Sequence, residues 1–130
     1  MRSCGRQKNK MDYFFDSYAI IEIIEGNQDY EKFSNIMFIT NALHLSEVFY
    51  YLLRTTNEET ANKIIGKLNF EFLEITPELA IEASKFKHRH KKEKLSFADC
   101  IGYITSIKND LTFLTGDGDF KDKENVEFIK

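Results

Sequence analysis

Four carboxylates stand where a charge is costly to keep. Asp16 and Asp117 lie just past the ends of short apolar runs, while Glu47 and Asp99 lie among apolar residues with helical spacing. An unpaired charge taken out of water loses several kcal/mol, so such acids need a positive partner. A hard divalent cation prefers oxygen ligands and can serve several carboxylates at once. The sequence therefore predicts a Mg²⁺ or Mn²⁺ site built from these four side chains.

Two of the acids have an equally ordinary structural interpretation. Asp16 could cap the helix that follows it, a role that is compatible with binding a metal. Asp99 lies three residues after Ser96 and could complete a capping box, although Asp is shorter than the usual Glu or Gln. Gly102 and Ser106 follow Asp99 on the same helix face. These small residues predict open space beside the Asp99 carboxylate.

The other acids differ in how much they reveal. Asp117 and Asp119 lie in the glycine-flanked turn TGDGDF, where Asp is common for conformational reasons alone. Glu47 lies inside ALHLSEVFYYLL, and the only basic residue on its predicted helix is Arg54, two turns away. Glu47 is therefore expected either to pair with a buried base or to bind a cation.

Alternating apolar runs and helical patterns define the elements that must position these acids. Ser17, the pair Thr76-Pro77 and Ser96 are typical helix starts. The expected strands span 13–15, 36–39, 70–75, 111–114 and 126–129, and the expected helices span 17–25, 29–34, 41–54, 57–68, 77–90 and 97–108.

Continuous apolar strands that alternate with helices predict a single α/β domain with a small parallel sheet of four to five strands, flanked by helices on both faces. Ligands bind such sheets at the carboxyl ends of the strands, near the point where the strand order reverses. Asp16 and Asp117 each follow a strand, and right-handed crossovers place both at this edge.

Composition excludes several classes of protein. With 130 residues, a net charge of −3 and no apolar run near 20 residues, the chain is expected to be one globular domain without a membrane span. Two cysteines are too few for a disulfide framework, and Cys100 is expected to be a buried thiol in a cytoplasmic protein. Residues 1–10 are expected to be a poorly ordered extension of a domain spanning 11–130, or alternatively a basic arm that touches nucleic acid.

A basic run precedes the helix that carries Asp99. Its members are Lys85, Lys87, Arg89, Lys91, Lys92 and Lys94, interrupted by Glu93. The run is either a solvated helix end or a rim that binds phosphates beside the acids. His88 and His90 lack the partners of a zinc site, and neither a serine triad nor a glycine-rich phosphate loop is present.

The four predicted acids lie in the segments YFFDSYAII, LHLSEVFYYLLR, LSFADCIGYITSIKND and TFLTGDGDF. In this order, the segments resemble the PIN domain, and most closely the VapC-like toxin ribonucleases of prokaryotic toxin–antitoxin pairs. The resemblance spans about residue 11 to the C-terminus. Tyr18 departs from it, since relatives often carry a small polar residue there.

The resemblance implies a metal-dependent endoribonuclease. Asp16, Glu47, Asp99 and Asp117 match the acidic metal-binding set, Asp119 matches a more variable fifth acid, and Thr115 matches a hydroxyl residue that supports the site. It also implies a homodimer and, for a toxin, an antitoxin partner.

A divalent cation held by carboxylates can activate water against a phosphodiester. Asp16 and Asp117 are the expected inner ligands, and Glu47 and Asp99 are expected to bind a second ion or orient water. Single-stranded or structured RNA is the expected substrate. Its phosphates are expected to contact Lys87, Arg89, Lys91, Lys92 and Lys94, and its bases are expected to stack on aromatic side chains such as Tyr18 or Tyr103. The alternatives are an RNA-processing nuclease outside a toxin pair, a magnesium-binding receiver-like domain and an inactive interaction module.

Overall fold

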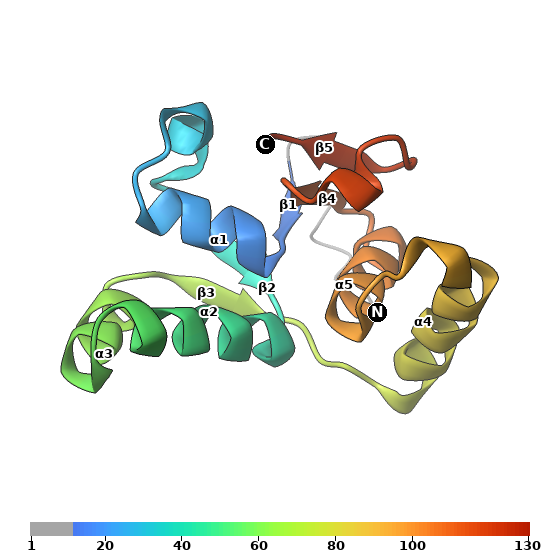
Figure 1. The fold of residues 1–130 in the computed structure, drawn as a ribbon, viewed down its shortest axis with the longest axis horizontal. Helices are drawn as coiled ribbons and strands as arrows, with labels where there is room; N and C mark the ends of the chain where they lie inside the picture. Colours follow the sequence, from blue (N-terminus) through green and yellow to red (C-terminus); the bar gives the residue numbers. More distant parts are fainter. Residues whose placement is uncertain (1–11) are drawn as a thin grey trace.

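The computed structural model describes residues 12–130, so the predicted extension of residues 1–10 lies outside the described part of the chain. One parallel sheet forms the centre of the domain, with the strand order β3-β2-β1-β4-β5 (Figure 1). The predicted single α/β domain is confirmed. The strands are β1 (Tyr13–Phe15), β2 (Phe38–Thr40), β3 (Phe70–Phe72), β4 (Thr112–Thr115) and β5 (Val126–Phe128).

Short polar side chains start the helices. Asp16, Asn41, Asn57, Thr76 and Ser96 each accept a hydrogen bond from a backbone N–H in the first turn that follows. Asp16, and not Ser17, caps the first helix: its carboxylate accepts from the backbone N–H of Ala19, and Ser17 is the first residue of α1. The helices are α1 (Ser17–Ile24), η1 (Gln28–Phe33), α2 (Ala42–Thr55), α3 (Glu58–Gly66), α4 (Pro77–Arg89), η2 (Lys91–Glu93), α5 (Phe97–Lys108) and η3 (Gly118–Phe120).

The sheet separates two apolar cores, because successive side chains of a strand point to opposite faces. Tyr13 and Phe15 pack with α1, η1, α2 and α3 on one face. Phe14 and Phe113 pack with α4 and α5 on the other. Figure 1 shows these two groups of helices on the two sides of the sheet. Cys100 is buried in the second core as a free thiol, as predicted.

The predicted elements differ from the observed ones at β2 and β3. β2 begins at Phe38, and the preceding Ile36 and Met37 are exposed. β3 ends at Phe72 and is only partly buried, since an edge strand has one neighbour and its middle residue is Glu71. Within residues 12–130, no helix has the length and apolar character to cross a membrane.

Candidate active site

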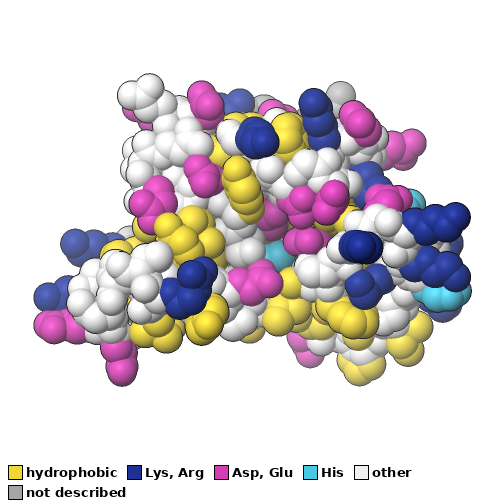
Figure 2. All heavy atoms as spheres, viewed as in Figure 1, with side chains coloured by type: hydrophobic (Ala, Val, Ile, Leu, Met, Phe, Trp, Pro, Cys, Tyr) yellow, Lys and Arg dark blue, Asp and Glu magenta, His cyan; other side chains and the backbone are white. Residues whose placement is uncertain are grey.

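The strand order reverses between β1 and β4, and this is where the acids gather. β2 and β3 continue to one side of β1, while β5 continues to the other side of β4. Asp16 directly follows β1, and its backbone N–H donates to Leu114 of β4 at 3.3 Å. Asp117 lies two residues beyond β4. Figure 2 shows acidic side chains gathered in the middle of this face of the molecule. This is the position that parallel sheets use for ligands.

Asp16 is the most deeply buried of the acids, with only 2% of its surface exposed. Its carboxylate accepts a 2.8 Å hydrogen bond from the Ala19 backbone and another from the Thr115 side chain. Burial nevertheless raises the pKa of Asp16 to about 7, and the nearby carboxylates of Asp99 and Asp117 add to the rise. Two hydrogen bonds do not offset the cost of ionising this group without a cation.

Asp99 is half-buried at the start of α5. It forms the predicted capping arrangement with Ser96: its backbone N–H donates to Ser96 Oγ at 3.0 Å, and its carboxylate takes hydrogen bonds from Ser96 in return. Burial raises the pKa of Asp99 to about 6, with further contributions from Asp117 and Glu47. The cap and the acidic cluster therefore use the same side chain.

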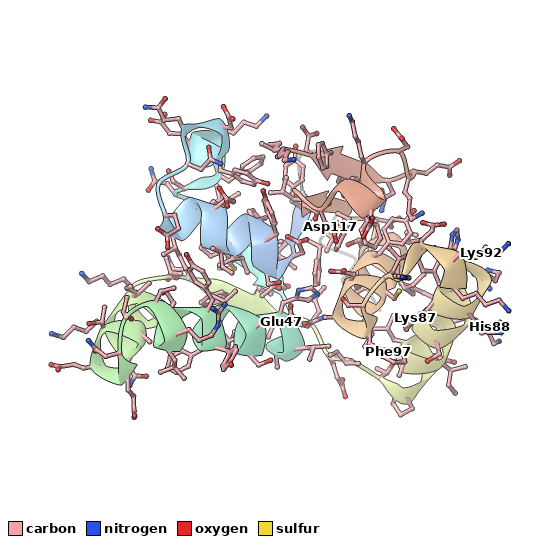
Figure 3. The ribbon with its side chains drawn as sticks, viewed as in Figure 1. Glu47, Lys87, His88, Lys92, Phe97 and Asp117 are labelled. Carbon is pink, nitrogen blue, oxygen red and sulfur yellow. The ribbon has the colours of Figure 1, made fainter. Side chains whose placement is uncertain are left out.

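Glu47 projects from α2, and Asp117 lies in the turn that follows β4 (Figure 3). The expectation that Glu47 is buried among apolar residues is wrong, since its side chain is 43% exposed. It accepts a 2.7 Å hydrogen bond from the Ser17 hydroxyl, which ties it to the residue after Asp16. α2 buries one side, including Val48 and Leu52, and turns Glu47 toward solvent at the cluster.

The remaining predicted residues hold the turn after β4 in shape. Thr115 is fully buried, and its Oγ1 accepts from the Asp117 backbone at 3.0 Å. The Asp117 carboxylate accepts from the Asp119 backbone at 2.9 Å, while Asp119 itself is exposed. Thr115 thus contacts the turn that carries Asp117 and also the carboxylate of Asp16.

The donor set fits a hard cation that keeps part of its water. All four clustered side chains offer carboxylate oxygen, the ligand type of Mg²⁺ and Mn²⁺. Within residues 12–130, no three His, Cys, Asp or Glu side chains already stand close enough to form a complete ligand set. Mg²⁺ contacts few carboxylates directly and reaches others through bound water, so coupled but separated acids suit it.

The predicted open groove over Asp99 does not exist. A Cβ on Gly102 would lie 2.7 Å from Nε2 of His44 and 3.0 Å from the rings of Phe14 and Phe113. The space is small because His44 fills it, and sequence reasoning overlooked this residue. Its spacing gave the available signal: His44 precedes Glu47 by three residues, which places both on one face of a helix.

The basic run lies on the flank of the site and is partly engaged in structural contacts. Lys85 pairs with Glu82 at 3.5 Å, and Lys87 donates to the Leu95 carbonyl. Glu93 pairs with both His90 and Lys123. In Figure 3, Lys92 and His88 lie on the outer side of α4 and η2, away from Glu47 and Asp117. Arg89, Lys91, Lys92 and Lys94 are exposed.

The aromatic residues beside the site differ from those expected. Tyr103 is 6% exposed and donates its hydroxyl proton to Glu124, so it cannot stack on a base. Phe97, two residues before Asp99, is 57% exposed, and Lys87 lies over its ring at 5.0 Å from the centroid. Tyr18 lies against Gly116, where a Cβ would come within 2.1 Å of its ring.

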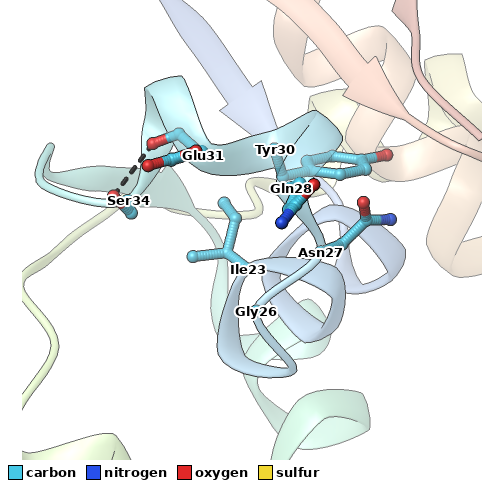
Figure 4. Close-up of a pocket in the computed structure, with 7 residues that line it drawn as sticks. All are labelled: Ile23, Gly26, Asn27, Gln28, Tyr30, Glu31 and Ser34. Atoms are coloured by element: carbon cyan, nitrogen blue, oxygen red, sulfur yellow. Dashed lines mark hydrogen bonds between the residues drawn. The ribbon is translucent and has the colours of Figure 1, made fainter.

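A separate hollow lies at the far end of α1, around the turn that leads into η1 (Figure 4). Several polar groups around it are hydrogen-bonded: Ser34 donates to the Glu31 carbonyl, and Asn27 donates to the Glu22 side chain and accepts from the Asp29 backbone. None of the four clustered acids lines it. It is therefore not part of the acidic site.

Comparison with known proteins places the chain in a family. The PIN domain model matches residues 13–126, which include all four acids. The chain belongs to the PIN domain family. A search of curated proteins found no match.

Solved structures with the same fold include VapC toxins. VapC20 of Mycobacterium tuberculosis, a Sarcin-Ricin loop cleaving toxin, is 19% identical over 91% of this chain and 99% of its own, with a TM-score of 0.72. A toxin-antitoxin complex from Klebsiella pneumoniae is 17% identical over 88% of this chain and 95% of its own, with a TM-score of 0.68. VapBC2 from Rickettsia felis, bound to a DNA fragment from its promoter, is 15% identical over 92% of this chain and 98% of the matched chain, with a TM-score of 0.68. These similarities establish a shared VapC-like fold.

Proposed function

We propose that this protein is a metal-dependent endoribonuclease. One observation carries the proposal: four carboxylates of a PIN domain lie around the strand-order reversal, and within residues 12–130 no cationic side chain pairs with Asp16 or Asp99, whose pKa values are raised. A site that makes its own acids repel one another is built to gain stability from a cation.

The four acids divide into two roles. Asp16 and Asp117 flank the strand-order reversal and would hold Mg²⁺ or Mn²⁺ directly. Glu47 and Asp99 would bind a second ion or orient the attacking water, and Asp119 stands beside them as an accessory ligand. A bound divalent cation neutralises charge on the scissile phosphate and lowers the pKa of its water. Thr115 and Ser17 keep the carboxylates of Asp16 and Glu47 in place by hydrogen bonds.

RNA is the proposed substrate, contacted at two places. Exposed cations of the basic run would meet phosphates, and the exposed ring of Phe97 would stack on an unpaired base. We further propose that the chain is the toxin of a VapBC-type pair, acting as a homodimer that an antitoxin protein binds. The VapC fold of its neighbours supports this role.

A receiver-like domain is the less suitable alternative. Receivers have the flavodoxin-like strand order 2-1-3-4-5, whereas this sheet has the order β3-β2-β1-β4-β5. An RNA-processing nuclease outside a toxin pair would share the same site. Co-purification with the product of an adjacent small reading frame would favour the toxin role.

Cleavage of labelled single-stranded RNA tests the proposal directly. We expect cleavage with Mn²⁺ or Mg²⁺, none with EDTA, and a loss of more than about 100-fold in Asp16→Asn and Asp99→Asn, since removing even an indirect contact to a metal ligand costs 10- to 100-fold. Circular dichroism should show both variants folded. Undiminished cleavage by either variant would refute the assignment of the acids.

A further inference from the structure

His44 is the one side chain in the described part of the chain that hydrogen-bonds to the backbone at two of the acids. Its Nδ1 accepts from the backbone N–H of Ser17 at 3.1 Å. Its Nε2 lies 3.0 Å from the backbone carbonyl oxygen of Ala98. The first group belongs to the peptide that joins Asp16 to Ser17, and the second to the peptide that joins Ala98 to Asp99.

The two backbone partners determine the protonation of the ring. A backbone N–H can only donate, so Nδ1 must carry a lone pair, and a carbonyl can only accept, so Nε2 must carry the proton. The 3.6 Å approach of Glu47 to Nδ1 is therefore not an ion pair. Burial lowers the pKa of His44 to about 4, which is consistent with a neutral ring.

The ring has no room to move. His44 is completely buried, with Phe14 packed edge-on at 5.4 Å between ring centroids. The bare Cα of Gly102 admits the ring, because a Cβ there would lie 2.7 Å from Nε2. The backbone of His44 is also fixed, since its N–H donates to Asn41 at the start of α2.

We propose that His44 is a positioning residue that fixes the separation of Asp16 and Asp99 for cation binding. It links the start of α1 to the start of α5, and its own helix carries Glu47 one turn further on. One imidazole ring thus bonds to the backbone next to Asp16 and next to Asp99, and Glu47 lies 3.6 Å from it. The inference rests on the proposed metal site and assigns the buried histidine a role in it.

Two substitutions of His44 each keep one of its two hydrogen bonds and remove the other. His44→Asn keeps an acceptor near the position of Nδ1, and His44→Gln keeps a donor near the position of Nε2. Tyr103→Phe is the matched control, because it removes one hydrogen bond of a buried side chain, 2.7 Å to the Glu124 backbone carbonyl, that involves none of the four clustered acids. Mn²⁺ affinity is measured by calorimetry, RNA cleavage by kcat and KM, and folding by thermal melting.

We expect both His44 variants to remain folded, to bind Mn²⁺ about 10- to 100-fold more weakly and to lose kcat by a similar factor, with KM for RNA nearly unchanged. Tyr103→Phe should keep wild-type Mn²⁺ affinity and kcat even if its melting temperature falls as far as those of the His44 variants. Wild-type Mn²⁺ affinity in both His44 variants, or equal losses in Tyr103→Phe, would overturn the proposal.

The Mn²⁺ measurement separates this proposal from the proposed function. If the wild-type protein binds Mn²⁺ but leaves RNA intact, the ribonuclease proposal fails, while weaker Mn²⁺ binding by the His44 variants still supports the positioning role. If the wild-type protein cleaves RNA and the variants match it, the positioning role fails and the ribonuclease stands.

Discussion

The acidic cluster and the basic run carry opposite charges, and they differ in how far their side chains are exposed to solvent. Asp16 is almost completely buried, and its acidic neighbours oppose its ionisation. Most lysines of α4 and η2 are exposed, and two have partners: Lys85 pairs with Glu82, and the half-buried Lys87 donates to the Leu95 carbonyl. The clustered acids lower the stability of the folded protein, whereas the solvated bases change it little.

This contrast distinguishes a binding site from an ordinary charged surface. Exposed charges are solvated and contribute little to stability, so their presence alone is weak evidence of function. Buried like charges lower stability unless a ligand offsets their repulsion, so their presence requires an explanation. The predictions below test this contrast, beginning with the largest expected effect.

Replacing the buried acid should stabilise the metal-free protein at pH 8. The pKa of Asp16 is raised in the folded state, so its contribution is favourable in acid and is lost as pH rises from about 4 through about 7. Asp16→Asn removes this loss and can keep the acceptor for Ala19. Each pH unit by which the pKa is raised corresponds to about 1.4 kcal/mol, so a gain of a few kcal/mol is expected at pH 8.

Chemical denaturation of metal-free protein at pH 4.5 and pH 8 measures this gain. Asp119→Asn is the control, since Asp119 is exposed and its replacement should change the free energy of unfolding by less than about 0.5 kcal/mol. An Asp16→Asn variant that is less stable than the wild type at pH 8 would show that the acids are not in conflict.

Binding of a cation should displace protons near pH 6. Asp16 and Asp99 have pKa values raised to about 7 and about 6, so both are partly protonated there and must ionise when a cation binds. Calorimetric titration with Mn²⁺ in two buffers of different ionisation enthalpy should show release of roughly 1.4 protons at pH 6 and much less at pH 8. Equal heats in both buffers at pH 6 would contradict the coupling of metal binding to these acids.

Reversing charge in the basic run should affect RNA binding moderately. Each lost phosphate contact to a single strand lowers the slope of log affinity against log salt by about 0.7, so Lys91→Glu with Lys92→Glu should reduce it by about 1.4. Lys63→Glu with Lys67→Glu, on and just after α3, makes the same charge change far from α4. If both pairs weaken binding equally, only net charge matters and the basic run is a solvated surface.

Phe97 offers a second test of the same surface with no change in charge. Phe97→Ala removes a ring that is exposed beside Asp99 and should weaken RNA binding by about 1–3 kcal/mol while leaving the salt slope unchanged. The exposed Ile107, at the other end of α5, provides an apolar control as Ile107→Ala. Unchanged affinity in Phe97→Ala would mean that bases do not stack there.

The sequence allowed the strands and most helix starts to be predicted, because their signals are local. Apolar triplets such as Tyr13–Phe15 are buried by both helical layers, and Asn41, Thr76 and Ser96 cap the helices that follow them. β3 was predicted too long because edge position is not a local property. Glu47 was expected to be buried because apolar neighbours on a helix do not reveal which face meets solvent.

The gathering of the acids depended partly on sequence and partly on tertiary structure. Strand ends in a parallel sheet meet at one edge, so the positions of Asp16 and Asp117 could be deduced from chain order. The packing beside Asp99 could not be deduced, since Gly102 next to a carboxylate indicates empty space unless the side chain from another helix is known. His44 fills that space from α2, more than fifty residues earlier in the chain.

Residue types and their order determined by themselves that this is a parallel α/β domain with carboxylates at one edge, because burial periodicity and helix caps act over a few residues. Only the tertiary structure decided which carboxylates repel one another, which is exposed, and that one neutral imidazole joins two of their peptides. Those properties depend on distances between distant segments, and such distances exist only after the helices have packed on the sheet.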